Sequence, residues 1–368
     1  MTERQKIVVA MSGGVDSSCV AALLVEQGHE VIGMTMQLYD SGVDVPSRKG
    51  ACCAGQDIYD AKRVAAKLGI PHYVLNYQSR FKEEVIQDFA DSYARGETPI
   101  PCIKCNQTVK FRDLLEQSRR LGADHLATGH YIQRLETENG TELHRGVDDD
   151  KDQSYFLYAT KKDQLEDLRF PLGGQSKSAT REIAARFGLS VADKPDSQDI
   201  CFVHDGYAKV VQKYRSDALR PGNIVDTQGA VLGQHQGIIF YTIGQRRGLG
   251  LGGLEEPMYV VAVNPERAEV VVGTQENLAV ESVILDELNW LINAPEGDFA
   301  LQVQFRSRMQ PIPAVLTCTD QGKAKVTFTE PQFGVSPGQA CVFYDDSRVL
   351  GGGTMRETIR IMTGQDHA

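Results

Sequence analysis

The chain has 368 residues, of which 41% are hydrophobic and 24% charged, and its formal net charge is −10. This length allows two or three domains with cores of their own, and no apolar run approaches the ~20 residues that span a bilayer. The acidic balance disfavours a protein that coats nucleic acid indiscriminately, but it leaves room for a local basic face that binds RNA. The cysteines lack the spacing of a disulfide framework, and no signal peptide precedes the first strand-like segment, so we expect a cytoplasmic protein without membrane attachment.

A glycine-rich loop follows the first apolar segment of the chain. Residues 12–17 read SGGVDS, between a strand-like segment at 7–10 and a helix-like segment at 18–25. Gly13 and Gly14 have no Cβ, so the backbone can turn sharply and direct successive N–H groups at a ligand in front of the helix. The sequence therefore predicts a phosphate-binding loop.

The side chains of this loop refine the prediction. Ser12 and Ser17 add hydroxyl donors, and Asp16 offers a carboxylate beside the phosphate, where Mg²⁺ would be held. The lysine of the Walker motif is absent, so the loop is not of that type. It resembles instead the S-G-G-x-D-S signature of the N-type ATP pyrophosphatases, which cleave ATP between the α and β phosphates and adenylate a substrate oxygen.

Strand-like and helix-like segments alternate through the first half of the chain, which predicts an α/β domain with a doubly wound parallel sheet. Further strands are expected at 30–36, 73–75 and 125–128, helices at 56–68, 81–94 and 109–121, and a proline-bounded loop at 102–105. Ligands of such sheets lie at the carboxyl ends of the strands. We therefore expect Met36, Gly129 and the SGGVDS loop to converge on one nucleotide.

The second half of the chain has a different pattern of predicted secondary structure. From residue 221 onward, short alternating strands such as 259–263 and 325–328 are separated by glycine and proline turns. We predict a catalytic domain at 1–205 with a helical crossover near 165–190, a central β-rich domain at 206–284, and a C-terminal β-barrel at 285–368.

Three cysteines stand outside apolar patterns. Cys102 and Cys105 form a C-x-x-C pair, and Cys201 lies in a polar segment. A thiolate is a strong nucleophile, and the nearby cation of Lys104 is expected to lower the thiol pKa, so Cys105 and Cys201 are candidate reactive thiols. Read alone, the C-x-x-C pair leaves a redox pair, half a zinc site and a pair of cluster ligands open. The other cysteines are predicted to be structural: Cys19, Cys52, Cys53, Cys318 and Cys341.

Six separated segments, in order along essentially the whole chain, resemble the motifs of the bacterial tRNA-specific 2-thiouridylases. They lie at 10–17, 98–106, 127–131, 151–157, 197–202 and 241–249. The resemblance implies an N-terminal domain of the adenine-nucleotide alpha-hydrolase-like kind with a pyrophosphatase (PP) loop. It also implies adenylation of the C2 oxygen of the wobble uridine by ATP, followed by displacement of AMP by sulfur, which gives 2-thiouridine and pyrophosphate.

The resemblance also assigns roles and partners. Cys201 carries the persulfide and Cys105 is the nucleophile that attacks it; the partners are the anticodon stem-loop of tRNA and a protein that donates persulfide sulfur, and the cofactors are ATP and Mg²⁺. The implied ATP contacts are Ala10, Met11, Ser12, Gly13, Gly14, Val15, Asp16, Ser17, Met36 and Gly129. The implied tRNA contacts are Ile100, Pro101, Cys102, His130, Lys151, Asp152, Gln153, Arg306, Ser307 and Gln339.

The sequence departs from the family pattern at one position. Many members have Asn-Pro-Asp where this chain has Ile100, Pro101 and Cys102, so the carboxylate near the target base is missing here. Two hypotheses follow. Cys102 is an accessory thiol, or Cys102, Cys105 and Cys201 are ligands of an iron–sulfur cluster with one open position that binds sulfide.

Two other functions remain as alternatives. The chain could be another adenylating ATP pyrophosphatase, related to the GMP and NAD synthetases, although the paired thiols and the lack of a glutaminase segment disfavour this. It could also be a nucleotide-regulated tRNA-binding protein without chemistry of its own. Candidate contacts to RNA phosphates are Lys161, Lys162, Lys177, Arg181, Arg246, Arg247, Arg306 and Arg308.

Overall fold

The computed structural model describes residues 3–39, 55–196, 200–203, 206–253, 256–319 and 322–360. The chain divides into two compact units, which we describe separately. The first comprises Met1–Ile86, Cys102–His204 and Ser347–Leu350, and the second comprises Gln87–Pro101, Asp205–Asp346 and Gly351–Ala368. Cys52, Cys53 and residues 197–199 of the Cys201 motif lie outside the described residues. Within the described part of the chain, no helix is long and apolar enough to cross a membrane.

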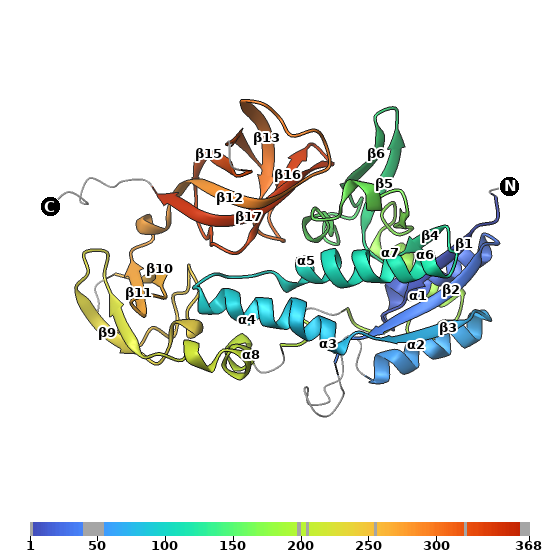
Figure 1. Ribbon diagram of the computed structural model, residues 1–368, viewed down its shortest axis with the longest axis horizontal. Helices are drawn as coiled ribbons and strands as arrows, with labels where there is room; N and C mark the ends of the chain where they lie inside the picture. Colours follow the sequence, from blue (N-terminus) through green and yellow to red (C-terminus); the bar gives the residue numbers. More distant parts are fainter. Residues whose placement is uncertain are drawn as a thin grey trace. The chain divides into compact units, whose positions relative to one another are not determined.

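The first unit is built on a five-stranded parallel sheet, which confirms the predicted α/β class (Figure 1). The strand order is β3 (His72–Asn76), β2 (Glu30–Gln37), β1 (Lys6–Ala10), β4 (His125–Ala127) and β7 (Leu168–Arg169). An antiparallel hairpin of β5 (Ile132–Thr137) and β6 (Gly140–Arg145) follows β4. The central position of β1 places the loop that follows it at the middle of the sheet edge.

Three helices share a hydrophobic core with β1. Ile7 and Val9 alternate toward this core, which also holds side chains of α1 (Val15–Glu26), α2 (Gly55–Leu68) and α7 (Lys177–Arg186). Helix α1 ends at Glu26, and Gly28, just after the C-cap residue Gln27, has a φ of 87°, the left-handed conformation that closes a helix. The predicted helical crossover near 165–190 is α7.

A helical segment carries Cys102 and Cys105. Helix α5 (Pro101–Cys105), the π-helical segment η2 (Asn106–Leu114) and α6 (Leu115–Arg120) follow one another without a gap, so the predicted loop at 102–105 is wrong. Proline fits the first position of a helix because its φ is already helical, and here it starts the helix. Within η2, the Gln164 side chain donates to the Phe111 carbonyl at 2.8 Å, an interaction that accompanies the altered backbone ladder.

A second helical segment contains a similar irregularity. The predicted helix at 81–94 is present as α3 (Gln78–Phe81), the π-helical segment η1 (Lys82–Ile86) and α4 (Gln87–Ala94). In the described residues, the short 3₁₀ helices are η3 (Ser154–Phe156), η4 (Lys162–Gln164), η5 (Ser216–Ala218), η6 (Ile238–Phe240) and η7 (Glu276–Leu278).

The second unit contains two β structures, as predicted (Figure 1). The first is a four-stranded sheet in the order β10 (Tyr259–Asn264), β11 (Glu269–Gly273), β8 (Gly222–Val225) and β9 (Val231–His235). The second is a six-stranded barrel that closes through the pairing of β12 with β17. Its order is β12 (Val280–Trp290), β15 (Ala324–Gln332), β14 (Ile312–Cys318), β13 (Asp298–Gln304), β16 (Ala340–Asp345) and β17 (Arg348–Arg360).

Two details of the second half differ from the sequence interpretation. Helix α8 (Tyr207–Tyr214) precedes the four-stranded sheet, at the start of the region predicted to be β-rich. Strand β12 runs through the expected boundary at 284/285, because the turn signal at 293–297 joins β12 to β13 inside the barrel. We propose that the barrel domain begins at Val280.

Candidate nucleotide and thiol site

The SGGVDS loop connects β1 to α1, so the strand, loop and helix stand in the predicted order. Gly13 has a φ of 75°, and a Cβ at this position would lie 2.1 Å from the carbonyl oxygen of Asp57. Both the backbone conformation and the space therefore require glycine here. Helix α1 begins directly after Gly14, so its first N–H groups face the same edge of the sheet.

Hydrogen bonds within the loop fix its shape. The Ser12 N–H donates to Ser17 Oγ at 3.1 Å, and the Ser18 hydroxyl donates to the Gly14 carbonyl at 2.7 Å. Ser17 is buried, whereas Ser12 is exposed. Ser17 therefore holds the loop closed, and the Ser12 side chain is open to a ligand.

The structure brings Gly129 to the loop. A Cβ on Gly129 would lie 2.8 Å from the Ser17 nitrogen and 3.0 Å from the Asp16 carbonyl carbon. Met36 lies near the end of β2, the strand next to β1, and is 7% exposed. The loop and Gly129 are thus adjacent, and Met36 lies on the neighbouring strand; their convergence on one nucleotide stays a prediction.

Asp16 is already paired in this structure. Lys177 Nζ lies 2.7 Å from Asp16 Oδ1 and 2.8 Å from Oδ2, and the Tyr131 hydroxyl donates to Oδ1 at 2.9 Å. Burial raises the pKa of Tyr131, so its hydroxyl keeps the proton that it donates. Among the described residues, no group of three His, Cys, Asp or Glu side chains is arranged to hold a metal. This donor set does not fit a resident Mg²⁺ ion.

Lys177 extends the network away from the loop. Its Nζ also lies 2.8 Å from Asp196 Oδ1, and Asp196 accepts further from Lys151 at 2.8 Å and from Arg181 at 3.2 Å. Burial opposes the ionisation of Asp196, but hydrogen bonds from Lys151 and Lys177 outweigh it and lower its pKa. Asp196 is therefore ionised at neutral pH.

A second lysine, Lys194, secures the other side of the loop. Its Nζ donates to the Gly13 carbonyl at 2.9 Å, to Asp57 at 2.6 Å and to Asp60 at 2.7 Å. Both aspartates belong to α2. Lys194 thus ties the glycine turn to α2.

The three candidate thiols all belong to the first unit but differ in exposure. Cys102 is exposed, Cys201 is half-buried and Cys105 is buried. Burial raises the pKa of Cys105 to about 11, and the cation that opposes this shift is Lys110. The expectation that Lys104 lowers this pKa is wrong, because burial at this position outweighs the charge.

The iron–sulfur hypothesis finds no support in the arrangement of the thiols. Cys102, Cys105 and Cys201 are all described, and they are not gathered as ligands of one metal site. Next to Cys201, the Phe202 ring packs edge-on against Phe81, with ring centroids 5.7 Å apart. Three other cysteines were predicted to be structural. Cys19 and Cys341 are buried, as expected of structural cysteines, and Cys318 is half-buried.

The raised pKa of Cys105 predicts slow alkylation. At pH 8, only about one thiol in a thousand is ionised when the pKa is about 11, and the thiolate is the reactive form. We expect iodoacetamide to label exposed Cys102 well before Cys105, and the Cys105 rate to rise roughly tenfold per pH unit up to about pH 11. Timed labelling followed by peptide mass spectrometry measures both rates. Equal labelling of the two thiols at pH 8 would contradict the prediction.

The predicted tRNA contacts of the first unit are held mostly by internal interactions. His130 Nδ1 lies 2.8 Å from Thr128 Oγ1, and burial lowers its pKa well below the usual value, so the ring is neutral. The Asp152 side chain, 5% exposed, accepts from Ser154 and Arg145. The Gln153 side chain accepts from the Tyr131 N–H at 3.0 Å. The side chains of His130, Asp152 and Gln153 are therefore engaged with other residues of the first unit.

The predicted tRNA contacts of the second unit gather at one end of the barrel. Arg306 and Ser307 are exposed in the loop between β13 and β14, and a Cβ on Gly334 would lie 3.1 Å from the Arg306 guanidinium. The Thr98 N–H donates to the Pro337 carbonyl at 2.8 Å. The segment that leads to Ile100 and Pro101 therefore lies beside the loop that carries Gln339.

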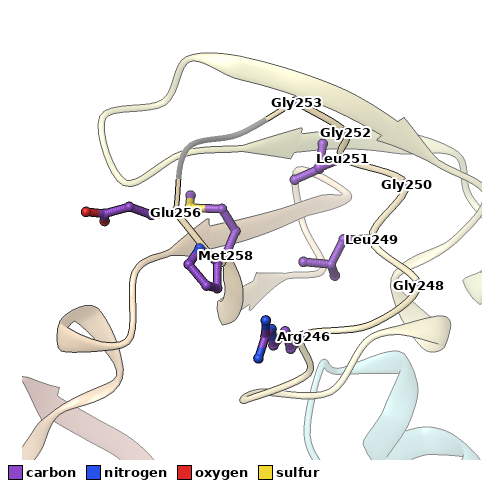
Figure 2. A pocket seen from close by; sticks show the side chains of 10 residues that line it. Arg246, Gly248, Leu249, Gly250, Leu251, Gly252, Gly253, Glu256 and Met258 are labelled. Carbon is purple, nitrogen blue, oxygen red and sulfur yellow. The ribbon is translucent and has the colours of Figure 1, made fainter.

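A hollow of about 610 Å³ lies elsewhere in the second unit (Figure 2). Arg246 and Glu256 line it together with a glycine-rich stretch at 248–253 and with Met258. Arg247 is exposed next to it. Both arginines stand where a phosphate contact was predicted, and that prediction remains open.

The sequence interpretation missed the residues that surround the loop. Lys177 and Arg181 were assigned to RNA phosphates, yet the structure pairs Lys177 with Asp16 and both cations with Asp196. Lys194 and Tyr131 carried no assigned role. One sequence signal pointed weakly to the position of Lys177: it directly follows Ser176, a serine that caps the N-terminus of α7.

A parallel sheet with a glycine-rich loop between its central strand and α1, together with Gly129 against that loop, defines a nucleotide-binding α/β domain of the PP-loop class. Three family models match the chain in order. They are described as tRNA methyl transferase HUP domain at 5–205, tRNA methyl transferase PRC-barrel domain at 208–274, and Aminomethyltransferase beta-barrel domain at 280–355.

Curated relatives are similar over nearly the full chain. The tRNA-specific 2-thiouridylase MnmA of Rhodospirillum centenum is 59% identical over 95% of this chain and 91% of its own length. The protein of the same name from Rickettsia rickettsii is 56% identical over 97% of this chain and 98% of its own. The chain belongs to the tRNA-specific 2-thiouridylase (MnmA) family of sulfurtransferase enzymes.

Among solved structures, a 4-thiouridine synthetase–RNA complex with bound ATP is similar at 16% identity and a TM-score of 0.39. The match covers 58% of this chain and 51% of that one.

Proposed function

We propose that this chain catalyses the ATP-dependent 2-thiolation of the wobble uridine of tRNA, giving 2-thiouridine, AMP and pyrophosphate. The observation that carries the proposal is the 59% identity, over 95% of the chain, to a protein named tRNA-specific 2-thiouridylase. The glycine-rich loop and the thiols of the first unit supply the groups that the two chemical steps need. The reaction belongs in the cytoplasm, where tRNA and reduced thiols occur together.

The first step activates the base. Uridine O2 is a poor leaving group, and attack of this oxygen on the α-phosphate of ATP transfers AMP to it and releases pyrophosphate. The loop N–H groups and the N-terminus of α1 receive the phosphates, and the exposed Ser12 hydroxyl adds a donor. Met36 and Gly129 are the proposed contacts to the nucleoside.

The second step transfers sulfur. A donor protein delivers sulfane sulfur to Cys201, which becomes Cys201–S–SH. The Cys105 thiolate attacks the inner sulfur, so that a Cys105–Cys201 disulfide forms and hydrosulfide leaves. Hydrosulfide attacks C2 of the adenylated base, a C–S bond forms, and AMP departs with the former O2. An external dithiol then reduces the disulfide.

Burial of Cys105 sets a condition on this step. Its pKa of about 11 means that only a small fraction of Cys105 is ionised at neutral pH, and Lys110 is the cation that favours the thiolate. Cys102, three residues earlier and exposed, is the proposed accessory thiol in place of the missing carboxylate.

The proposal is tested with purified protein, ATP, unmodified tRNA and a persulfide donor. We expect 2-thiouridine and AMP in equal amounts by mass spectrometry of digested tRNA and by chromatography. Cys201→Ser should abolish transfer from the persulfide donor. AMP without thiolation would favour an adenylating ligase instead, and tRNA binding without AMP would favour a non-catalytic binding protein.

The barrel end that carries Arg306 is the proposed site for the anticodon region. Arg306 and Arg308 are both exposed, so their charges are available to phosphates. The double variant Arg306→Ala/Arg308→Ala should weaken tRNA binding about tenfold at low salt and reduce the slope of log K against log salt by about two. Filter binding across a salt series measures both, and ATP affinity is the control. An unchanged salt slope would remove this loop from the RNA footprint.

A further inference from the structure

The loop motif lacks a lysine of its own, and the fold supplies one from a distant part of the chain. Lys177 opens α7, 161 residues after Asp16. The residue is 9% exposed, and its Nζ lies within 2.8 Å of three carboxylate oxygens, two on Asp16 and one on Asp196. An ammonium group has three N–H donors, so all three are used in this arrangement.

The two carboxylate partners of Lys177 differ in their other hydrogen-bond donors. Asp196 also accepts from Lys151 and Arg181, and so keeps two cations if Lys177 leaves. The other side-chain donor to Asp16 is the neutral Tyr131 hydroxyl, so Asp16 would be left without a cation if Lys177 left it. The bond between Lys177 and Asp196 is therefore the less costly one to exchange.

The surroundings of Lys177 keep its ammonium group at the loop during such an exchange. The Tyr131 ring lies beneath the ammonium, with its centroid 5.6 Å from Nζ. The Lys177 backbone N–H donates to Asp148 at 2.8 Å, which fixes the first turn of α7. The Lys177 backbone is therefore anchored, and one hydrogen-bond partner of its ammonium group, Asp196, can be replaced.

We propose that Lys177 binds the pyrophosphate portion of ATP, exchanging Asp196 for a phosphate oxygen while it stays paired with Asp16. Asp196, which also accepts hydrogen bonds from Lys151 and Arg181, is a positioning residue that keeps Lys177 at the loop before the nucleotide arrives. This inference rests on the proposed ATP-dependent function. Lys177 then performs the task that a Walker lysine performs from within its own loop.

The test compares the binding of inorganic pyrophosphate and of AMP to the full-length protein by calorimetry. Lys177→Met should weaken pyrophosphate binding tenfold or more, because a charge-assisted hydrogen bond is lost, and change AMP binding less than threefold. Lys177→Arg should restore pyrophosphate affinity to within fivefold of the natural protein. Thermal unfolding shows that each variant is folded.

Asp196→Asn gives a readout that a purely structural role would not produce. The competing carboxylate is removed, so pyrophosphate should bind about threefold or more tightly, opposite in direction to Lys177→Met. Arg186→Met is the matched control, since Arg186 lies on the same helix but pairs with Glu26 at the surface, and it should change pyrophosphate affinity less than twofold.

Unchanged pyrophosphate affinity in Lys177→Met would overturn the inference, and so would weakened affinity in Asp196→Asn. A natural protein that binds neither ATP nor pyrophosphate would instead overturn the proposed function, and this inference with it.

Discussion

Replacing Cys105 by serine should reduce tRNA thiolation by about a thousandfold or more while adenylation continues. A hydroxyl at this position does not form the disulfide that releases hydrosulfide from the Cys201 persulfide, so the sulfur stays on the protein. Adenylation uses the loop that follows β1 and does not need the thiol. The measurement is 2-thiouridine in digested tRNA, alongside exchange of labelled pyrophosphate into ATP.

Cys318→Ser is the control for this variant. Cys318 is half-buried at the end of β14 in the second unit and has no proposed role, so thiolation should stay within twofold of the natural protein. Substantial thiolation by Cys105→Ser with a persulfide donor would move the nucleophile to another thiol, with exposed Cys102 the first to examine.

Gly13→Ala should weaken ATP binding strongly by deforming the loop. Its Cβ would lie 2.1 Å from the Asp57 carbonyl oxygen, and its φ of 75° is unfavourable for alanine. The strain costs about 1–3 kcal/mol of stability, and relief of the clash moves the N–H groups away from the phosphates. We expect ATP affinity to fall at least a hundredfold in calorimetry and the melting temperature to fall by several degrees.

Gly28→Ala is the control that separates backbone strain from the steric clash at Gly13. Gly28 has a φ of 87°, yet a Cβ there would meet nothing within 4 Å. Alanine at this position should cost about 1 kcal/mol of stability and leave ATP affinity unchanged. Equal losses of ATP affinity in both variants would show that the loss comes from backbone strain and not from the clash of the new Cβ with α2.

Much of the first unit follows from local patterns in the sequence. The apolar segments of β1, β2 and β3 and the periodic helix α2 were predicted to within one or two residues of their bounds. Each pattern is local, since a strand or an amphipathic helix repeats its apolar residues at a short spacing. The glycine loop was found for the same reason, because its strand and helix flank it directly.

The remaining features depend on contacts between distant residues. Lys177 meets Asp16 only because α7 packs beside α1, and no local pattern marks that pairing. The pKa of Cys105 follows from its burial, whereas the sequence showed only the adjacent Lys104. Pro101 was interpreted as a loop boundary but begins a helix, since proline is compatible with both.

The contrast between Cys102 and Cys105 bears on how the protein withstands oxidants. Peroxides and oxidised glutathione react with exposed thiolates, so a buried and protonated Cys105 is slow to be damaged. Cys102, three positions earlier on the surface, meets such reagents first. A sulfenic acid or mixed disulfide formed there is reversible by cellular thiols.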